Sequence, residues 1–306
     1  MSLVELHSPL MIVARRELDR RLCEAAARAG AIPVSDRVVR IAPTDRGFRV
    51  ETEHATHEAD YLIGADGAKS LVRKSLQAQH CITLSTPLEL FSVSLTSYPT
   101  VPMPDRIDIK FFADLNGYAW LFPRLDHVSA GICAAASTPT PVLREALASY
   151  LQQVLGVTGE AMVGALIPSF DSTVIRRFPV EGGRFSLVGD AAGTVDPLTR
   201  EGIRFAVRTG ELVGQCDVPR NPGAYQKAYL QELVPELTRA ARLTRAFFST
   251  RFLTSFVRCL HRSPRAARVF SDLVAGVQPY RTLVRRCVML SPLIAMDYLR
   301  TRRKVS

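Results

Sequence analysis

Two apolar runs, far apart in the chain, each end in a short segment that combines glycine with aspartate. The first is Tyr61–Gly64, followed by Ala-Asp66-Gly67, and the second is Phe185–Val188, followed by Gly189-Asp190. We expect each run to form a buried strand that delivers its aspartate to the carboxyl end of a sheet, where open α/β sheets place their ligands. One domain is then built from discontinuous parts of the chain, with the intervening residues as an inserted unit.

The segment after Asp190 has the composition of a ligand-binding turn. Three small residues that let a ligand approach the backbone follow the aspartate: Ala191, Ala192 and Gly193. Pro197 and Gly202 then shape the entry to a helix predicted from about Thr199 to Gln215, whose first N–H groups favour a negatively charged or electron-rich ligand edge. The alternative is an ordinary tight turn between a strand and a helix.

The rest of the chain divides into a mixed N-terminal part, a β-rich middle and a helical end. In the first part the pattern predicts a strand over Leu10–Ala14, a helix over Glu17–Ala29 that stops at Gly30, and strands between residues 37 and 63. Residues 80–177 are predicted to be mainly β, with one helix near Pro141–Val154. From Ala224 onward the pattern is helical, with breaks expected near three prolines: Pro264, Pro279 and Pro292.

Taken together, the two glycine–aspartate segments resemble FAD-dependent oxidoreductases of the para-hydroxybenzoate hydroxylase superfold. Residues 64–67 resemble its DG motif, residues 189–193 resemble its GD motif, and Arg15 matches the arginine that opens the helix before the small strand meander. The resemblance implies that the GD aspartate contacts the ribityl and pyrophosphate region of FAD and that the DG motif supports the pyrophosphate. The cofactor-binding residues that it implies are Arg15, Asp66, Gly67, Gly189, Asp190, Pro197, Gly202 and Ile203.

A third motif resembles the substrate-cavity motif of geranylgeranyl reductases. It reads Tyr118-Ala-Trp120-Leu-Phe122-Pro123, followed after seven residues by Gly131-Ile-Cys133, where the family has a glycine at the last position. On a strand the three aromatic side chains point to one face. The resemblance implies that they line a cavity for an isoprenoid chain, with Pro123 and Gly131 as further substrate-binding residues. A row of ordinary core aromatics is the alternative.

The glycine-rich G-x-G-x-x-G turn that seats the ADP half of FAD in this superfold occurs nowhere in the sequence. We therefore expect an α/β chain whose Rossmann-like FAD-binding domain lacks its first βαβ unit, with an inserted antiparallel sheet and a helical C-terminal region. The expected domains are residues 1–78 with 178–235 for FAD, 79–177 for substrate, and 236–306 for the basic helices.

Charge is concentrated at the C-terminal end of the chain. From Arg239 onward there are 15 Lys or Arg residues against two acids, Asp272 and Asp297. This pattern favours a solvated helical face or a peripheral membrane contact, and no recognised motif points to nucleic acid. Scattered cysteines without a C-x-x-C pair argue against disulfides or zinc, and His54-x-x-His57 alone does not predict a metal site. With no signal-peptide pattern at the start, a cytoplasmic location is expected.

The leading hypothesis is an FAD-dependent oxidoreductase that reduces C=C bonds of an isoprenoid or similar apolar substrate, with NAD(P)H or a ferredoxin-like protein as electron donor. The sequence does not identify a catalytic residue, and Tyr118 and Cys133 are candidates for the proton donor by location only. A flavin monooxygenase or halogenase-like enzyme is the first alternative, since the superfold is shared. The second is a non-catalytic remnant that binds an apolar ligand or a membrane surface.

Overall fold

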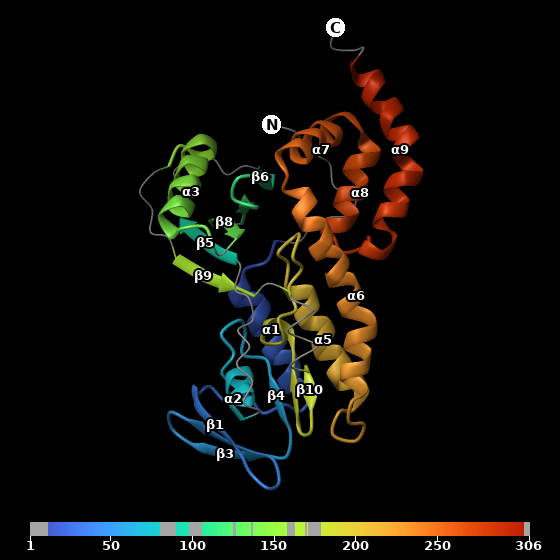
Figure 1. Ribbon diagram of the computed structural model, residues 1–306. Helices are drawn as coiled ribbons and strands as arrows, with labels where there is room; N and C mark the ends of the chain where they lie inside the picture. The colour runs from blue at the N-terminus through green and yellow to red at the C-terminus, as the bar shows by residue number, and fades with distance from the viewer. Residues whose placement is uncertain are drawn as a thin grey trace.

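The computed structural model describes residues 12–79, 90–97, 106–124, 127–135, 137–157, 163–168, 170 and 179–302. Helix α1 (Arg15–Arg28) precedes an antiparallel three-stranded sheet of β1 (Val38–Pro43), β2 (Phe48–Thr52) and β3 (Thr56–Ala59). The chain then enters β4 (Leu62–Gly64) and α2 (Leu71–Gln79). The β1–β3 sheet lies at one end of the elongated molecule, and α1 stands nearer its middle (Figure 1).

A second sheet joins segments that are distant in sequence. It contains β10 (Glu181–Gly182), β11 (Phe185–Leu187) and β4 in the order β10-β11-β4, and β11 runs parallel to β4. The core around it includes Leu76 of α2, Leu187 of β11 and Tyr229 from the helical part of the chain. The predicted pairing of the two glycine–aspartate strands, and with it a mixed α/β fold, is confirmed.

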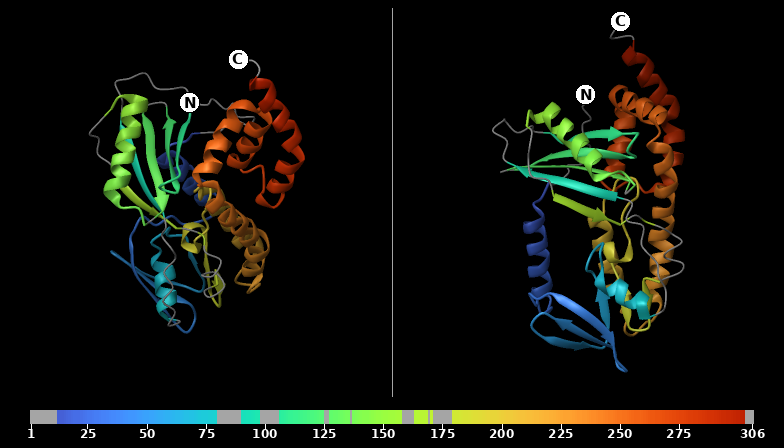
Figure 2. Two further views of the ribbon diagram at one scale, coloured as in Figure 1. Left: turned by 45° about the horizontal axis from the view of Figure 1, so that its top comes forward. Right: turned by 60° about the vertical axis from the view of Figure 1, so that its left-hand side comes forward.

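The middle of the chain forms a separate five-stranded antiparallel sheet. Its strands are β5 (Leu90–Ser97), β6 (Asp108–Phe112), β7 (Gly117–Pro123), β8 (Val128–Ala135) and β9 (Val163–Ile167), in the order β6-β7-β8-β5-β9. Helix α3 (Thr140–Leu155) packs on one face, where Ala119 and Leu121 meet Leu143 and Leu147. Figure 2 shows this helix lying across the sheet.

The last third of the described chain is helical. After the short 3-10 turn η1 (Gly189–Ala192) come α5 (Ile203–Cys216), α6 (Ala224–Phe247), α7 (Thr250–Arg262), α8 (Pro264–Val274) and α9 (Tyr280–Arg302). Helix α6 runs along the molecule from the β10-β11-β4 sheet to the α7–α9 cluster (Figure 1). No helix among the described residues is long and apolar enough to cross a membrane.

The structure corrects three predicted boundaries. Residues 12–14 form no strand, and Leu10 lies outside the described residues. Helix α5 begins at Ile203 rather than Thr199, because Arg200 adopts a left-handed backbone conformation (φ 61°) that an α-helix cannot contain. Pro292 lies inside α9 and does not break it. The hydroxyl of Ser291 donates to the carbonyl of Val288, the group whose usual helical N–H partner proline lacks.

Candidate functional site

The two glycine–aspartate turns lie side by side at the carboxyl end of the parallel strand pair. Gly64 of β4 is in register with Leu187 of β11, and the N–H of Val188 donates to the carbonyl of Gly64 at 2.9 Å. A side chain at Gly64 would collide with Leu187 and Val72, so a glycine lets these strands and α2 approach closely. Asp66 and Asp190 follow the two strands directly, as the sequence predicted.

The carboxylate of Asp66 holds the start of α2. It accepts hydrogen bonds from the Ser70 hydroxyl and from the N–H groups of Leu71 (2.6 Å) and Val72 (3.1 Å). These bonds satisfy donors that a helix N-terminus otherwise leaves without partners. Gly67 has φ 78°, and a Cβ there would meet no atom within 4 Å. The backbone at Gly67 is therefore accessible to a ligand, whereas the Asp66 carboxylate is already hydrogen-bonded to α2 and Ser70.

Arg73 joins the two turns, a role that the sequence reading missed. Arg73 is only 7% exposed. Its guanidinium donates to the carbonyls of Ala68 (2.9 Å), Ala191 (2.7 Å) and Asp190 (3.4 Å). Burial lowers the pKa of this guanidinium, and the nearby carboxylates of Asp66 and Asp190 oppose the shift. The sequence signal that could have indicated this role is an arginine in the first turn of the helix that follows the strand-end aspartate.

Asp190 presents its carboxylate differently from Asp66. It is partly buried, and no hydrogen bond joins its carboxylate oxygens to a residue that the structure describes. Burial raises its pKa, while Arg15 and Arg73 act in the opposite direction. A Cβ at Gly202 would lie 3.1 Å from one of its oxygens, so the glycine keeps the space beside the carboxylate open. Such a carboxylate fits a ligand that brings hydroxyl donors.

The turn from Gly193 to Ile203 is held by its own hydrogen bonds. Asp196 is buried and accepts from the N–H groups of Leu198 (2.8 Å) and Thr199 (3.0 Å) and from the hydroxyl of Tyr280 (3.0 Å). Pro197 is buried within this turn, whereas Ile203 is 46% exposed at the start of α5. The hydrogen bonds of Asp196 therefore fix this turn, and Gly202 is the predicted residue of the segment that lies beside the Asp190 carboxylate.

Two features of the structure favour glycine at position 189. Its φ is 54°, and a Cβ would lie 3.0 Å from that of Ala206 on α5. Its N–H donates to the buried hydroxyl of Thr209 at 2.9 Å, a contact that sequence reading did not identify. Because η1 packs closely against α5, it fixes the position of Asp190, the residue after Gly189.

The aromatic row of β7 lies on the face of the sheet opposite α3. Ring centroids of Tyr118 and Trp120 are 6.1 Å apart, and those of Trp120 and Phe122 are 6.3 Å apart. Gly131 stands opposite Trp120 in the register of β8 and adds no side chain there. Pro123 ends the strand. The predicted alternation of the row is confirmed by this arrangement.

Tyr118 connects the aromatic row to the cofactor turn. Its hydroxyl donates to the carbonyl of Thr199, which belongs to the segment between Asp190 and α5. The ring also packs edge-on against Phe111, which in turn contacts Phe247 of α6. The two sets of residues that the sequence singled out thus meet, and the helical region closes one side of the aromatic row.

Neither suggested proton donor has a free proton in this arrangement. Burial raises the pKa of Tyr118 well above its ordinary value, and its proton is engaged with Thr199. Burial likewise raises the pKa of Cys133 to about 11, and its thiol donates to the carbonyl of Tyr118 at 3.7 Å. The Tyr118 hydroxyl holds the sheet to the Thr199 turn and the Cys133 thiol bonds within the sheet, so both groups fit a structural role.

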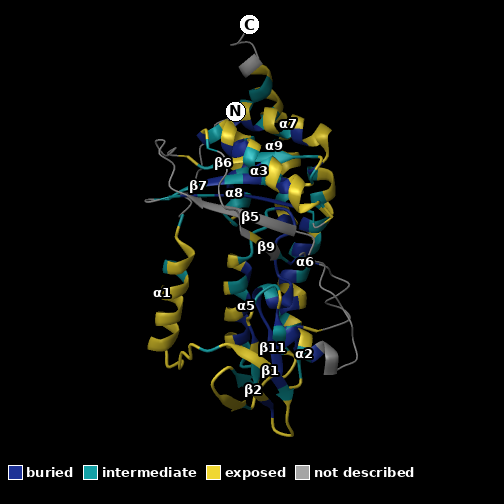
Figure 3. Ribbon diagram, turned by 90° about the vertical axis from the view of Figure 1, so that its left-hand side faces the viewer, coloured by how far each residue is buried: buried dark blue, intermediate teal, exposed yellow. Residues whose placement is uncertain are grey.

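Arg15 stands at the edge of the site. It opens α1 and forms an exposed ion pair with Asp19 at 3.2 Å. None of the residues of α1 is buried, and Figure 3 shows this helix standing apart from the body. The guanidinium nevertheless acts on the carboxylate of Asp190, where it opposes the rise in pKa that burial causes.

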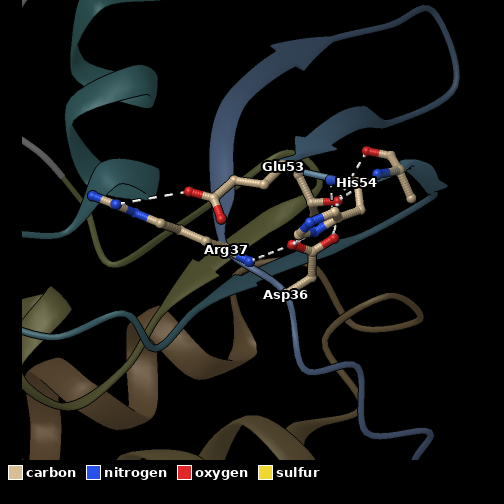
Figure 4. Close-up of polar contacts among 6 residues, drawn as sticks. Asp36, Arg37, Glu53 and His54 are labelled. Atoms are coloured by element: carbon tan, nitrogen blue, oxygen red, sulfur yellow. Dashed lines mark hydrogen bonds and ion pairs between the residues drawn. The ribbon is translucent and has the colours of Figure 1, made fainter.

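A separate polar cluster lies at the β1–β3 sheet (Figure 4). Ligand-type atoms of Asp36, Glu53 and His54 lie within 4.8 Å of one another. Asp36 already accepts from the Thr52 hydroxyl (2.6 Å), the His54 ring (2.9 Å) and the Arg37 N–H (2.8 Å). These bonds tie the segment before β1 to the β2–β3 turn, and His57 is not part of the cluster.

The Asp36 cluster makes the stability of the β1–β3 sheet depend on pH. Hydrogen bonds from Thr52 and His54 lower the pKa of Asp36 from 3.8 to about 2. Because the folded-state pKa is depressed, the ionised form stabilises the fold above about pH 4, and this contribution is lost as pH falls through about 2. An NMR titration of Asp36 should give a midpoint near 2, and Thr52→Val should move it toward 4. A midpoint near 4 in the unchanged chain would refute this.

The residues at the strand ends suit part of an FAD molecule. The partly buried carboxylate of Asp190 and the open backbone at Gly67 match the hydroxyl-bearing linker and phosphates of the cofactor. A glycine-rich turn for the ADP half is absent from the sequence. The fit therefore concerns the ribityl side of the cofactor.

Comparisons with known proteins find similar sequences. Geranylgeranyl diphosphate reductase from Nicotiana tabacum is 28% identical over 233 residues, which cover 69% of this chain and 48% of that protein. Menaquinone reductase from Mycolicibacterium smegmatis is 28% identical over 240 residues, covering 71% of this chain and 56% of that protein. The chain thus spans about half the length of the curated relatives it matches.

A solved structure shares the fold. The geranylgeranyl bacteriochlorophyll reductase-like protein from Thermoplasma acidophilum aligns with a TM-score of 0.69 at 19% identity, covering 94% of this chain and 79% of that one. The family model described as FAD binding domain matches residues 5–211, which include both glycine–aspartate turns and the aromatic row. The resemblance predicted from the sequence is confirmed, and the chain belongs to the FAD binding domain family.

Proposed function

We propose that this protein is an FAD-dependent oxidoreductase that reduces C=C bonds of an isoprenoid or similar apolar substrate. The observation that carries the proposal is the contact between Tyr118 and Thr199, which joins the aromatic row to the turn that follows Asp190. A substrate lying along the row would thereby reach a flavin held at the turn. The printed names of the relatives, geranylgeranyl diphosphate reductase and menaquinone reductase, support an isoprenoid-bearing substrate.

The residues proposed to hold FAD are those implied by the sequence. Asp190 would accept hydrogen bonds from cofactor hydroxyls, Gly67 would leave room for the cofactor, and Gly189 would let η1 pack closely on α5. Pro197, Gly202 and Ile203 would shape the turn beside it. Asp66 acts by fixing the DG turn, and Arg15 adds positive charge near Asp190. When bound and reduced, FAD supplies a hydride to one alkene carbon, while a proton adds to the other.

The protein's own contribution is to orient the substrate and exclude water. Trp120 and Phe122 offer stacked apolar surface, Gly131 leaves space opposite Trp120, and Pro123 bounds the row. Burying an apolar chain against such surface is favourable by roughly 25 cal/mol per Å². The electron donor is proposed to be NAD(P)H or a ferredoxin-like protein.

The proposed domains follow the sequence boundaries. Residues 1–78 and 178–235 would form the FAD-binding domain, residues 79–177 the substrate domain, and residues 236–306 the basic helical region. The parallel pairing of β4 with β11 supports the discontinuous first domain, while α6 continues without interruption across residue 235 into the third.

The test supplies FAD, a chemical reductant and geranylgeranyl diphosphate to the purified chain, which removes any dependence on the natural electron donor. Mass spectrometry should find a product with two hydrogens added for each reduced bond.

Trp120→Ala should lower kcat/KM by at least tenfold, because it removes about 1.5–3 kcal/mol of apolar contact. Val142→Ala, on the exposed side of α3, is the control. A chain that retains flavin but leaves this and other prenyl substrates unchanged would contradict the proposed reaction.

A further inference from the structure

A pocket of about 550 Å³ lies between α8 and α9, away from the aromatic row. Its lining includes four arginines and no carboxylate among the described residues: Arg265, Arg268, Arg285 and Arg286. Met289 and Leu290 supply an apolar wall. A pocket that combines guanidinium groups with apolar surface suits an anionic head attached to an apolar body.

Two of these arginines are fixed in place by aspartates. Arg265 pairs with Asp297 at 2.5 Å, and Arg286 pairs with Asp272 at 2.7 Å and donates to Gln278 at 2.8 Å. These contacts hold α8 against α9 and set the walls of the pocket. Arg285 is exposed on the α9 wall and extends the positive surface outward.

The outward face of α9 is apolar and exposed. Val288 and Met289 are each 66% exposed, Leu299 is 60% exposed and Val284 is 58% exposed. Figure 1 places α9 at the outer edge of the molecule, and Figure 3 colours much of its surface as exposed. Arg281 and Arg285 lie among these residues, and Asp297 is the only acid within α9. A solvated face would not need this concentration of apolar side chains.

We propose that α9 docks on an anionic membrane surface, with its outer apolar residues in the interface and a lipid phosphate in the arginine pocket. The positive charge of this helix complements anionic lipid headgroups, and Met289 belongs to both the pocket and the apolar face. Exposed apolar side chains next to arginines let the helix contact both the acyl boundary and the headgroups of such a surface. The proposal extends beyond the proposed reaction and does not depend on it.

Co-sedimentation with vesicles tests the proposal without flavin or substrate. The unchanged chain should bind vesicles of equal parts phosphatidylglycerol and phosphatidylcholine, and bind pure phosphatidylcholine weakly. Arg281→Gln/Arg285→Gln should lower the partition coefficient by about 30-fold, because each arginine near such a surface contributes about 1 kcal/mol. Val288→Ser/Met289→Ser should lower it at least tenfold.

The matched control is Arg46→Gln/Arg184→Gln, which removes the same charge from exposed residues of turns in the two smaller sheets. It should bind vesicles within twofold of the unchanged chain, and circular dichroism should find every variant folded. Equal loss in the control would mean nonspecific attraction and would overturn the proposal. Binding of inorganic phosphate without vesicle binding would assign the pocket to a soluble anion, and oligomerisation abolished by Val288→Ser/Met289→Ser would assign the face to a second copy.

Discussion

Replacing Arg73 with Met should lower the free energy of unfolding by about 3 kcal/mol. The substitution leaves the buried carbonyl of Ala191 and the partly buried carbonyl of Ala68 without their donor, and an unsatisfied buried polar group costs about 1–3 kcal/mol. Urea denaturation measures the change. Lys74→Met, which removes an exposed charge one residue along the same helix, should change stability by no more than about 0.5 kcal/mol.

Arg73→Lys separates charge from geometry. A lysine keeps the positive charge but has no planar fork to reach carbonyls in both turns. We expect it to recover less than half of the lost stability. If Arg73→Met and Lys74→Met proved equally stable, the guanidinium would not be what holds the DG and GD turns together.

Gly117→Ala should destabilise the five-stranded sheet by at least 3 kcal/mol. A Cβ at this position would lie 2.0 Å from the backbone carbonyl of Cys133, and neither backbone can move without parting β7 from β8. Because Tyr118 and Trp120 follow on β7, their placement would be lost as well. Thermal unfolding followed by near-ultraviolet circular dichroism reports both effects.

Gly210→Ala is the matched control for this prediction. Gly210 lies within α5, and a Cβ there would meet no atom within 4 Å. Alanine is favoured over glycine inside a helix by about 1 kcal/mol, so this variant should be slightly stabilised. Gly117→Ala as stable as the unchanged chain would mean that the β7–β8 spacing is looser than described.

Sequence patterns predicted the parts of the fold that local residues determine. Alternation along β7 places Ala119 and Leu121 in the core and Trp120 on the other face, and helix α3 occupies residues 140–155, close to its predicted range. The strand ends at Asp66 and Asp190 were predicted because glycine and aspartate next to each other are typical of turns.

Contacts between distant segments could not be predicted in this way. The role of Arg73 depends on carbonyls more than a hundred positions away, and the start of α5 depends on the left-handed conformation of Arg200. Pro292 was expected to end a helix, yet the neighbouring Ser291 hydroxyl satisfies the carbonyl left free. Helix α1 was recognised from its period, but its spacing gave no sign that it would have no buried residue.

The central claim is that the turns after β4 and β11 hold FAD. The most direct test is the visible absorption of the purified chain after incubation with FAD and gel filtration, alongside Asp190→Ala. The account predicts that flavin bands remain with the unchanged chain and that the variant binds FAD at least tenfold more weakly, since it loses a charge-assisted hydrogen bond of about 1.5–3 kcal/mol. A colourless chain, or equal retention of flavin by Asp190→Ala, would contradict it.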